Sequence, residues 1–476
     1  MKKRNFTKVI LIGLLALSSV ACRKEGCTDP DATNYNEEAK KDDGSCNYAS
    51  DDDSMKELQG DLSTQTLTKD KQYLLKGQVF VRDGQTLTIE PGTVIFGDKG
   101  TKGTLIIDRG GKIIAEGTVS EPIVMTSALP AGQRDKGDWG GLILLGHANQ
   151  NQPDPAVEGI TPAVYFGGND DADNSGILKY VRVEFAGIEL TPNNETNSIT
   201  MGGVGNGTTM EYCMVSFGGD DGFEWFGGSV DGKHFISYGS WDDCYDVDYG
   251  YSGKVQFGLA VRYPSFADQS GSNNFECDNG PNDDVTSLLT TGTFSNFTCI
   301  GPRLEDGQTI SGNYQHAMDL RRRTAVTIAN SVFIGMPRGL RMRQTSVYDN
   351  YNNQEGFLTH NILCAPGDQF LSGGNHTAQD VENYWFANDN TLEAGTDFNA
   401  IINDLGLSTS IFFGNNLNTN YSSNPQFTVT GGQLASGADF SNAQLAGMEQ
   451  VSYRGAFGAT DWTQGWAEWN PILKEY

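Results

Sequence analysis

Basic side chains are scarce in this sequence. Its 476 residues include 33 Lys and Arg against 60 Asp and Glu, which gives a formal net charge of −27. A protein that binds nucleic acid needs a basic face to meet the phosphates, so this composition excludes nucleic acid as a partner. The excess of acid favours a protein that charge keeps soluble outside the cytoplasm, or one that binds cations.

Decisive catalytic motifs are also absent. The five histidines show no metal-ligand spacing, and no Ser/His/Asp arrangement or glycine-rich phosphate loop stands out. Any chemistry in this chain must therefore rest on its carboxylates and arginines.

Long apolar runs are missing after the N-terminus. The run Val9–Val20 follows a basic start and is too short for a permanent membrane span. With Ala21 and Cys22 it predicts a lipoprotein signal peptide over residues 1–21 and a lipid on Cys22, the first residue of the mature protein. We therefore expect a lipid-anchored outer-membrane protein exposed at the cell surface, with the periplasmic face as the alternative.

The cysteines predict one disulfide. Cys27 and Cys46 bracket a short acidic loop without a core, and an oxidising compartment favours a bond between them. Residues 22–54 are thus predicted to form a lipid-anchored acidic module and tether, whose acids either are solvated or bind calcium. Strand alternation places Cys213 and Cys277 inward as buried thiols.

Short β-rich segments separated by glycine recur along the chain. From Leu87 onwards, apolar triplets repeat at intervals of 18 or 19 residues, and residues 213–224 align with residues 235–246 at an offset of 22. Such periods are typical of a solenoid, and the lack of helical segments between the strands indicates a parallel β-helix. We predict this all-β fold over residues 55–450, with roughly 18–30 residues per coil.

The last segment, residues 451–476, is rich in tryptophan. Trp462, Trp466 and Trp469 fall at positions i, i+4 and i+7, and Asp461 precedes them as an N-cap. Because a solenoid must cover its last coil, we predict a C-terminal helical cap here, with a sugar-binding platform as the alternative.

Several motifs resemble a known family. They are Leu87-Thr-Ile-Glu-Pro-Gly-Thr-Val-Ile, Gly137-Asp-Trp-Gly-Gly, Gly219-Asp-Asp-Gly-Phe-Glu-Trp-Phe-Gly-Gly, Ser252-Gly-Lys-Val-Gln-Phe-Gly and Tyr453-Arg-Gly-Ala-Phe-Gly. These segments resemble the right-handed parallel β-helix lipoproteins of Bacteroidota cell envelopes, and the segment bracketed by Cys27 and Cys46 is similar to a short module of surface proteins from that phylum. The resemblance implies a right-handed coil and a place in the cell envelope, and it implies no particular activity.

Strand alternation predicts a charged column on the outside of the β-helix. In Phe223-Glu-Trp-Phe the aromatic rings point inward and the carboxylate points outward. In the same register, the column reads Glu224, Asp246, Glu276, Arg321 and Arg341, with Asp248 and Asp278 beside it. Successive coils lie roughly 4.8 Å apart, so these carboxylates repel one another unless a cation, an arginine or protonation relieves them.

Calcium is the expected cofactor of this column, because carboxylate oxygens are the ligands that it prefers. The candidate metal ligands are the acids of the central repeats: Asp220, Asp221, Glu224, Asp242, Asp243, Asp246, Asp248, Glu276 and Asp278.

Three functions agree with these features. The favoured one is a non-catalytic binding or scaffold β-helix for a glycan or an envelope partner. The first alternative is a calcium-dependent polysaccharide lyase or a glycoside hydrolase, with Glu224, Asp246, Glu276, Arg321 and Arg341 as candidate catalytic residues. Pectate lyases of β-helix fold combine carboxylates, calcium and arginine in this way, whereas the motifs of polygalacturonases are missing. The second alternative, an accessory subunit of an outer-membrane protein complex, leaves no mark in the sequence.

Overall fold

A computed structural model describes most of the chain. The described residues are 24–30, 32, 34–46, 55–191, 194–303, 307–393, 395, 397–408 and 425–476. Contacts divide the chain into two compact units, residues 1–54 and residues 55–476. Among the described residues, no helix is long and apolar enough to span a membrane. Cys22 and the predicted signal peptide lie outside the described residues.

The first unit is a small loop closed by a disulfide. Cys27 and Cys46 are bonded, which confirms the predicted pair. Cys27 is buried, and two exposed ion pairs, Lys24 with Glu38 and Lys41 with Glu25, join the residues before Cys27 to the loop. Because so little apolar surface is buried here, the covalent bond is the main constraint on this unit.

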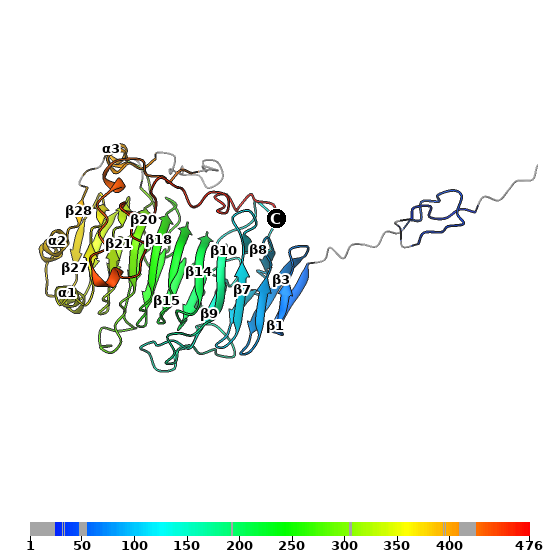
Figure 1. Cartoon of the computed structure of the whole chain (residues 1–476), viewed down its shortest axis with the longest axis horizontal. Coiled ribbons are helices and arrows are strands. Elements are labelled where there is room, and N and C mark those ends of the chain that lie inside the picture. Colours follow the sequence, from blue (N-terminus) through cyan, green and yellow to red (C-terminus); the bar gives the residue numbers. More distant parts are fainter. Residues whose placement is uncertain are drawn as a thin grey trace, which may run out of the picture. The chain divides into compact units, whose positions relative to one another are not determined.

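The second unit is a right-handed parallel β-helix with three faces (Figure 1). Twenty-six strands belong to one continuous sheet, in which each strand pairs in parallel with strands of the coils before and after it. The first face, called the acidic face below, consists of β1 (Lys56–Leu62), β3 (Gln72–Val81), β6 (Thr104–Ile107), β9 (Leu142–Leu145), β13 (Ile199–Gly202), β15 (Phe223–Phe226), β17 (Tyr245–Asp248), β19 (Phe275–Cys277), β21 (His316–Leu320), β24 (Arg338–Met342) and β27 (Phe370–Ser372).

The other two faces share several long strands. Short strands of the second face are β2 (Gln65–Leu67), β4 (Thr86–Ile89), β7 (Lys112–Glu116), β22 (Thr327–Ala329) and β25 (Leu358–Thr359). Short strands of the third face are β5 (Val94–Gly97), β8 (Ile123–Ser127), β23 (Val332–Ile334), β26 (Ile362–Cys364) and β28 (Thr391–Leu392). Five strands bend from the second face into the third: β10 (Gly176–Glu184), β14 (Thr209–Ser216), β16 (Gly232–Tyr238), β18 (Lys254–Val261) and β20 (Thr293–Ile300).

Each bend is made by a residue in the left-handed region. Tyr180, Tyr212, His234 and Phe257 occupy this position in successive coils, with φ between 50° and 64°. Their rings stack with centroids 4.4, 4.2 and 5.2 Å apart. Non-glycine residues are uncommon at positive φ because this backbone conformation is unfavourable. Stacking of the rings between coils compensates for that cost.

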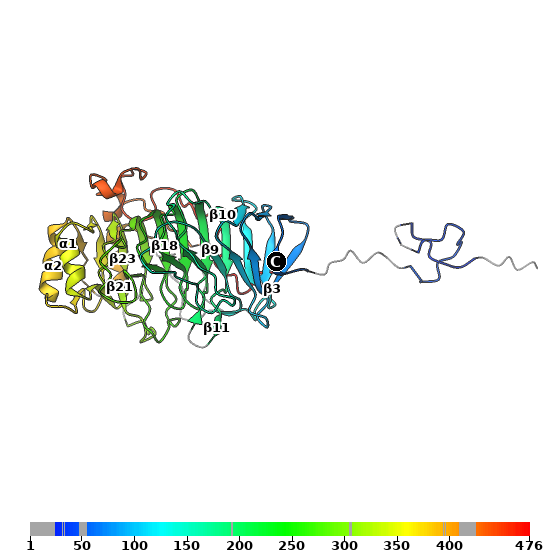
Figure 2. The same cartoon turned by 90° about the horizontal axis from the view of Figure 1, so that it is seen from below.

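Helices cover the far end of the coil. Two of them, α1 (Thr345–Asn352) and α2 (Ala378–Ala387), lie at the end of the solenoid opposite β1 (Figure 2). A third helix, α3 (Phe398–Leu405), begins after Asp397, whose side chain accepts a hydrogen bond from the backbone N–H of Ala400. Short 3-10 turns follow at Gln433–Ala435 and Ala443–Leu445. Among the described residues, the last strand ends at Leu392.

The predicted tryptophan helix over residues 451–476 is wrong. This segment contains turns and no helix, and it runs back along the β-helix towards β8 and β10 (Figure 1). Trp466 packs edge-on against the stacked rings of Tyr180 and Tyr212, with centroids 5.8 and 6.0 Å away. Gly465 has a φ of 89°, which interrupts a helix, and burial of the indoles against the aromatic stack replaces the helical face.

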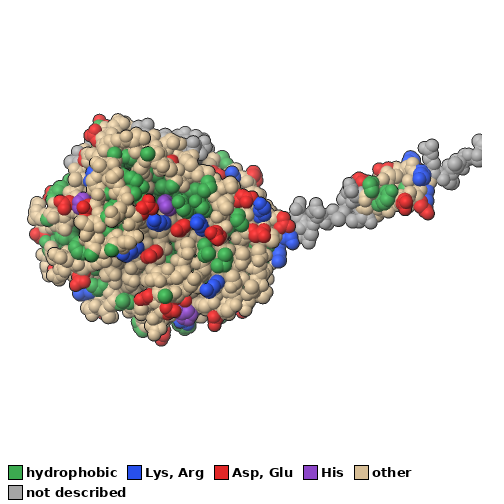
Figure 3. Space-filling view, in the orientation of Figure 1, with side chains coloured by type: hydrophobic (Ala, Val, Ile, Leu, Met, Phe, Trp, Pro, Cys, Tyr) green, Lys and Arg blue, Asp and Glu red, His purple; other side chains and the backbone are tan. Residues whose placement is uncertain are grey.

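Charged side chains are mixed on the outer surface. On the face of the β-helix seen in Figure 3, Lys and Arg lie among Asp and Glu. Some of these groups pair between coils, as Arg82 does with Asp61 at 2.8 Å and Lys69 with Glu121 at 2.6 Å. Exposed pairs contribute only about 0–1 kcal/mol each, so the fold does not depend on them.

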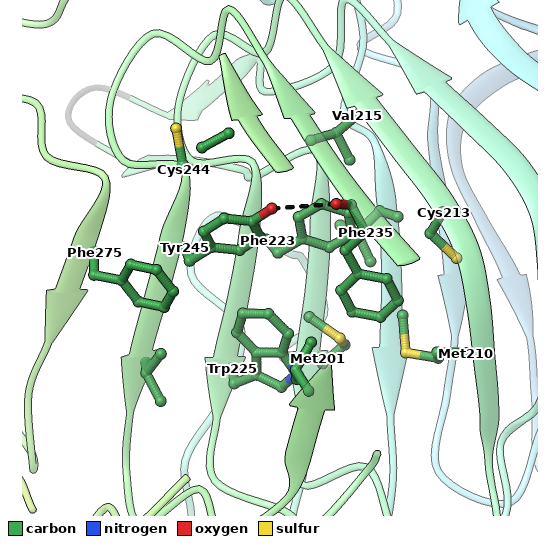
Figure 4. Close-up of a cluster of buried hydrophobic side chains, with 14 of the residues drawn as sticks. Met201, Met210, Cys213, Val215, Phe223, Trp225, Phe235, Cys244, Tyr245 and Phe275 are labelled. Carbon is green, nitrogen blue, oxygen red and sulfur yellow. Dashed lines mark hydrogen bonds between the residues drawn. The ribbon is translucent and has the colours of Figure 1, made fainter. Parts of the chain in front are cut away.

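The core consists of inward-facing side chains stacked from coil to coil. Phe223, Trp225, Tyr245 and Phe275 are fully buried in the interior, as strand alternation predicts (Figure 4). Phe223 stacks on Tyr245 at 5.8 Å, and Tyr245 lies 5.1 Å from Phe275. The buried hydroxyl of Tyr245 donates to the carbonyl of Leu259 at 2.9 Å. The thiols of Cys213 and Cys277 are buried as predicted.

Candidate functional site

Three carboxylates form one column on the acidic face. Glu224 of β15 pairs with Asp246 of β17, and Asp246 pairs with Glu276 of β19. Thr200 of β13 continues the column on the other side of Glu224. The structure thus brings together the three acids that the repeat predicted as neighbours.

The predicted place of Arg321 in this column is wrong. Glu276 pairs with Asp319, and Asp319 pairs with Arg341. The predicted column takes Arg321 and Arg341 as neighbours, which is an offset of 20 residues, whereas the register joins Asp319 to Arg341, an offset of 22. Arg321 therefore follows the strand and reaches Asp278, beside the column.

The column lies outside the coil but not on an open surface, because five of the nine predicted metal ligands are buried and the other four are only partly exposed. Glu224 is 8% exposed, Asp221 7% and Asp243 3%. The segment from Ala156 to Glu158 and the segment from Glu195 to Asn197 form the opposite walls of a cavity of about 300 Å³ above them. These segments come from long insertions between strands, which fold over the acidic face.

The turn before each strand carries a side-chain ladder. The carboxylate of Asp221 accepts a hydrogen bond from the backbone N–H of Asp243 at 2.7 Å. The carboxylate of Asp243 accepts one from the backbone N–H of Asn273, and the amide oxygen of Asn273 accepts one from the backbone N–H of His316 at 3.0 Å. Asp221 and Asp243 thus satisfy buried backbone donors as well as adding charge.

The arginines are held by carboxylates. Arg321 donates from Nε to Asp278 at 2.8 Å and also pairs with Glu276. Arg341 donates from Nε to Asp319 at 2.7 Å. Neither arginine lines the cavity above Glu224. Both arginines therefore neutralise the acids at the Glu276 end of the column, and neither faces the cavity.

Two of the predicted metal ligands serve the backbone and the arginines. Asp248 accepts hydrogen bonds from the backbone N–H groups of Tyr249, at 2.6 Å, and Gly280, at 2.5 Å. Asp278 binds Arg321 and also Arg322, at 2.8 Å. Oδ1 of Asp248 and both oxygens of Asp278 thus already have partners.

Seven of the nine predicted ligands lie close enough to share cations. Their oxygens form three groups, each with all three ligand atoms within 4.8 Å of one another: Asp220, Asp221 and Asp242; Asp221, Glu224 and Asp246; Asp243, Asp246 and Glu276. Asp221 and Asp246 each belong to two groups, so the three groups form a continuous row. Hard divalent cations such as calcium bind sets of this kind.

Several oxygens in this row have no partner. Oδ1 of Asp242 and Oδ1 of Asp246 are buried without a hydrogen bond from any described residue. Asn197 is 5% exposed, its amide nitrogen donates to Glu224, and its Oδ1 also has no partner. A buried polar atom without a partner costs about 1–3 kcal/mol, and cations bound to the row would satisfy the oxygens of Asp242 and Asp246.

Burial also raises the pKa of these carboxyl groups. The pKa of Glu276 rises to about 8 and that of Asp242 to about 6, mainly because burial disfavours the charged form. Burial and the neighbouring Glu224 and Glu276 raise the pKa of Asp246. The carboxyl groups of the row therefore favour protonation, and a cation bound there would compete with the protons.

A second, more open groove of about 590 Å³ adjoins the cavity. Glu195 and Asp220 line both, and the groove continues past Lys136, Trp241 and Asp242. The sequence offered no signal for this groove, because its walls come from turns of five different coils.

Arg262 is a further residue that sequence reasoning missed. It follows β18, is fully buried, and donates from Nη1 to the carbonyls of Ser240, at 3.0 Å, and Asp242. Its Nη2 lies 3.9 Å from Asp243. A buried guanidinium at this place offsets part of the charge of the acids from inside the coil.

Comparison with known proteins identifies the family. The sequence pattern of the family described as a pectate-lyase like beta helix domain matches residues 60–403, which is more than two thirds of the chain. The chain therefore belongs to this family. No curated protein and no solved structure matches it significantly.

Proposed function

From its membership of the pectate-lyase-like β-helix family and from its acidic groove, we propose that this protein binds a polysaccharide without cleaving it. The observation that carries the proposal is the row of seven clustered carboxylates, two of which, Asp242 and Asp246, have an oxygen without a partner. Asp220, Asp221 and Glu224 of this row line the cavity, and Asp220 and Asp242 line the groove. A divalent cation, calcium first among them, would bind this row and present coordination positions to the hydroxyl or acidic groups of a glycan.

The cell-envelope part of the proposal rests on the sequence. A lipid on Cys22 would hold the protein in the outer membrane, with the acidic module as a tether and the β-helix at the cell surface. Mass spectrometry of the protein extracted from membranes should find a diacyl modification on Cys22. A C22A variant that still fractionates with the outer membrane would contradict the anchor.

Calcium is tested by thermal unfolding. Titration of the chelator-treated protein with calcium should raise the unfolding temperature of the wild type. The variant Asp246→Asn should keep the fold and lose most of this rise, because Asp246 belongs to two of the three ligand groups. A control, Asp319→Asn, removes an acid that is outside these groups and should leave the calcium response in place. An equal rise in wild type and D246N would remove the cation from the proposal.

Glycan binding is tested with immobilised acidic and neutral polysaccharides, in the presence of calcium or chelator. Binding that requires calcium and is lost in D246N supports the proposal. The absence of binding to every member of such a panel would contradict it.

A calcium-dependent lyase or glycoside hydrolase is the second candidate, because the family description names pectate lyases and the acids lie in a row. Against it, Arg321 and Arg341 are held in ion pairs and line neither the cavity nor the groove. Incubation with polysaccharides should therefore release neither unsaturated products, followed by their absorbance, nor new reducing ends. Calcium-dependent turnover would replace the binding function with the enzyme, and co-purification of a stable membrane protein would favour an accessory subunit.

A further inference from the structure

One lysine stands among the acids of the groove. Lys136 lies in the turn between β8 and β9, and its Nζ is 3.5 Å from the centroid of the Trp241 ring. Trp241 is itself fixed, because its indole N–H donates to Asp268 at 2.6 Å and Phe266 packs against the ring at 4.8 Å. The ammonium group thus has a defined position on an aromatic face.

The ammonium group of Lys136 has no ion pair. No described carboxylate lies within 4.0 Å of its Nζ, although Asp268, Asp220 and Glu195 are near enough to favour its charge. Lys136 is partly buried, and burial lowers its pKa. Lys136 thus lines the groove with an ammonium group that has no carboxylate partner among the described residues.

Lys136 is also distinctive within the site. Of the described residues that line the groove or the adjoining cavity, it is the only Lys or Arg. Beside it the groove is lined by three glycines, and a Cβ on Gly219 would lie 2.8 Å from the Cα of Gly137. Because these glycines have no side chains, they leave the groove beside the ammonium group open to a ligand.

We propose that Lys136 determines specificity by pairing with an anionic substituent of the polysaccharide, a carboxylate, sulfate or phosphate. This inference rests on the proposed function of the same groove. An anion beside Asp220 and Asp242 would be repelled unless positive charge surrounds it, and Lys136 and a cation at these two acids would supply that charge from two sides. Because Lys136 covers Trp241, the ring serves to place the ammonium group and not to stack on a sugar.

The test compares polysaccharides in pairs that share one backbone. Each acidic polymer, bearing carboxylate, sulfate or phosphate, is measured by calorimetry beside its carboxyl-reduced, desulfated or dephosphorylated form, in the presence of calcium. The wild type should bind at least one acidic member more tightly than its neutral counterpart. The variant K136M should lose about tenfold or more of the affinity for the acidic member and little for the neutral one, since a charge-assisted hydrogen bond contributes about 1.5–3 kcal/mol.

Two further variants separate recognition from structure. K136R keeps the charge and should retain the preference for the acidic member. K112M removes an exposed lysine of β7, which lines neither the groove nor the cavity, and should bind like the wild type. Equal losses for acidic and neutral polymers in K136M, or no loss for either, would overturn the role of Lys136 while leaving glycan binding in place. If no polymer binds the wild type, the proposed function fails and this inference fails with it.

Discussion

Asp221 and Asp243 occupy equivalent turns of successive coils, and the carboxylate of the first accepts a hydrogen bond from the backbone N–H of the second at 2.7 Å. The next turn has Asn273 in place of an aspartate, and its amide oxygen accepts the same bond from His316. The chain thus shows that an amide is sufficient for the ladder. The negative charge at Asp221 and Asp243 is not needed for the fold, and this leaves it available for a cation.

Substitution of Asp221 should separate these two roles. D221A leaves the buried N–H of Asp243 without an acceptor and should lower the free energy of unfolding by about 1–3 kcal/mol. D221N keeps an acceptor and should be at least as stable as the wild type in chelator, because it removes a buried charge among like charges. Denaturant unfolding with chelator and with calcium measures both effects. A D221N protein that is as unstable as D221A in chelator would contradict this separation.

The cation-free protein should lose stability as the pH rises from about 5 to about 8. Burial raises the pKa of Glu276 to about 8 and that of Asp248 to about 7, so the folded state binds more protons than the unfolded chain in this window. Stability falls with rising pH wherever the folded state binds more protons. Asp319, whose pKa is lowered by Arg341, acts in the opposite sense, but only at pH values near or below its ordinary pKa.

Denaturant midpoints in chelator at pH 5, 6.5 and 8 measure this slope. The variant E276Q, neutral at every pH, should flatten it and serves as the matched comparison. A free energy of unfolding that rises steadily from pH 5 to pH 8 would contradict the prediction, because it would mean that ionisation of these carboxyl groups does not destabilise the folded state.

Much of the fold could be predicted because strand alternation and coil length repeat from one coil of a β-helix to the next. Alternation alone places Phe223 and Trp225 inward and Glu224 outward, and the offset of 22 residues fixes Asp246 beside Glu224. Both predictions depend only on residues close in sequence and on successive coils of equal length. The aromatic core and the three-acid column follow from them.

The rest depends on contacts between distant segments. Arg321 was misplaced because it was matched to Arg341 at an offset of 20 residues, whereas the coil from β21 to β24 has 22, and no local pattern fixes that length. The burial of Glu224 depends on segments near residues 156–158 and 195–197, whose path the sequence does not repeat. Trp466 likewise packs against Tyr180, nearly three hundred residues away, where helical spacing predicted a local cap.

The C-terminal segment should therefore be needed for stability along the whole coil. Trp466 is 1% exposed, and Arg182 donates to its carbonyl at 3.1 Å. W466A should cost about 3–5 kcal/mol, the usual loss for a buried tryptophan, measured by denaturant unfolding. W466F keeps ring contact with Tyr212 and should cost less. A loss below about 1 kcal/mol in W466A would show that the segment is only loosely attached.

Removal of Arg321 should be more harmful than removal of the acids around it. Arg321 binds Glu276 and Asp278, whose side chains are 14% and 4% exposed. R321M therefore leaves the largely buried Glu276 without its cationic partner and leaves Asp278 with Arg322 alone. Loss of one partner of a buried pair costs about 3–5 kcal/mol.

The double variant R321M/D278N removes charge of both signs and should recover part of this loss, because fewer unpaired charges stay buried. Urea unfolding of the two variants at pH 7 measures the difference. If the double variant is less stable than R321M, Arg321 contributes through packing rather than charge, and its place as the neutralising end of the acidic column is wrong.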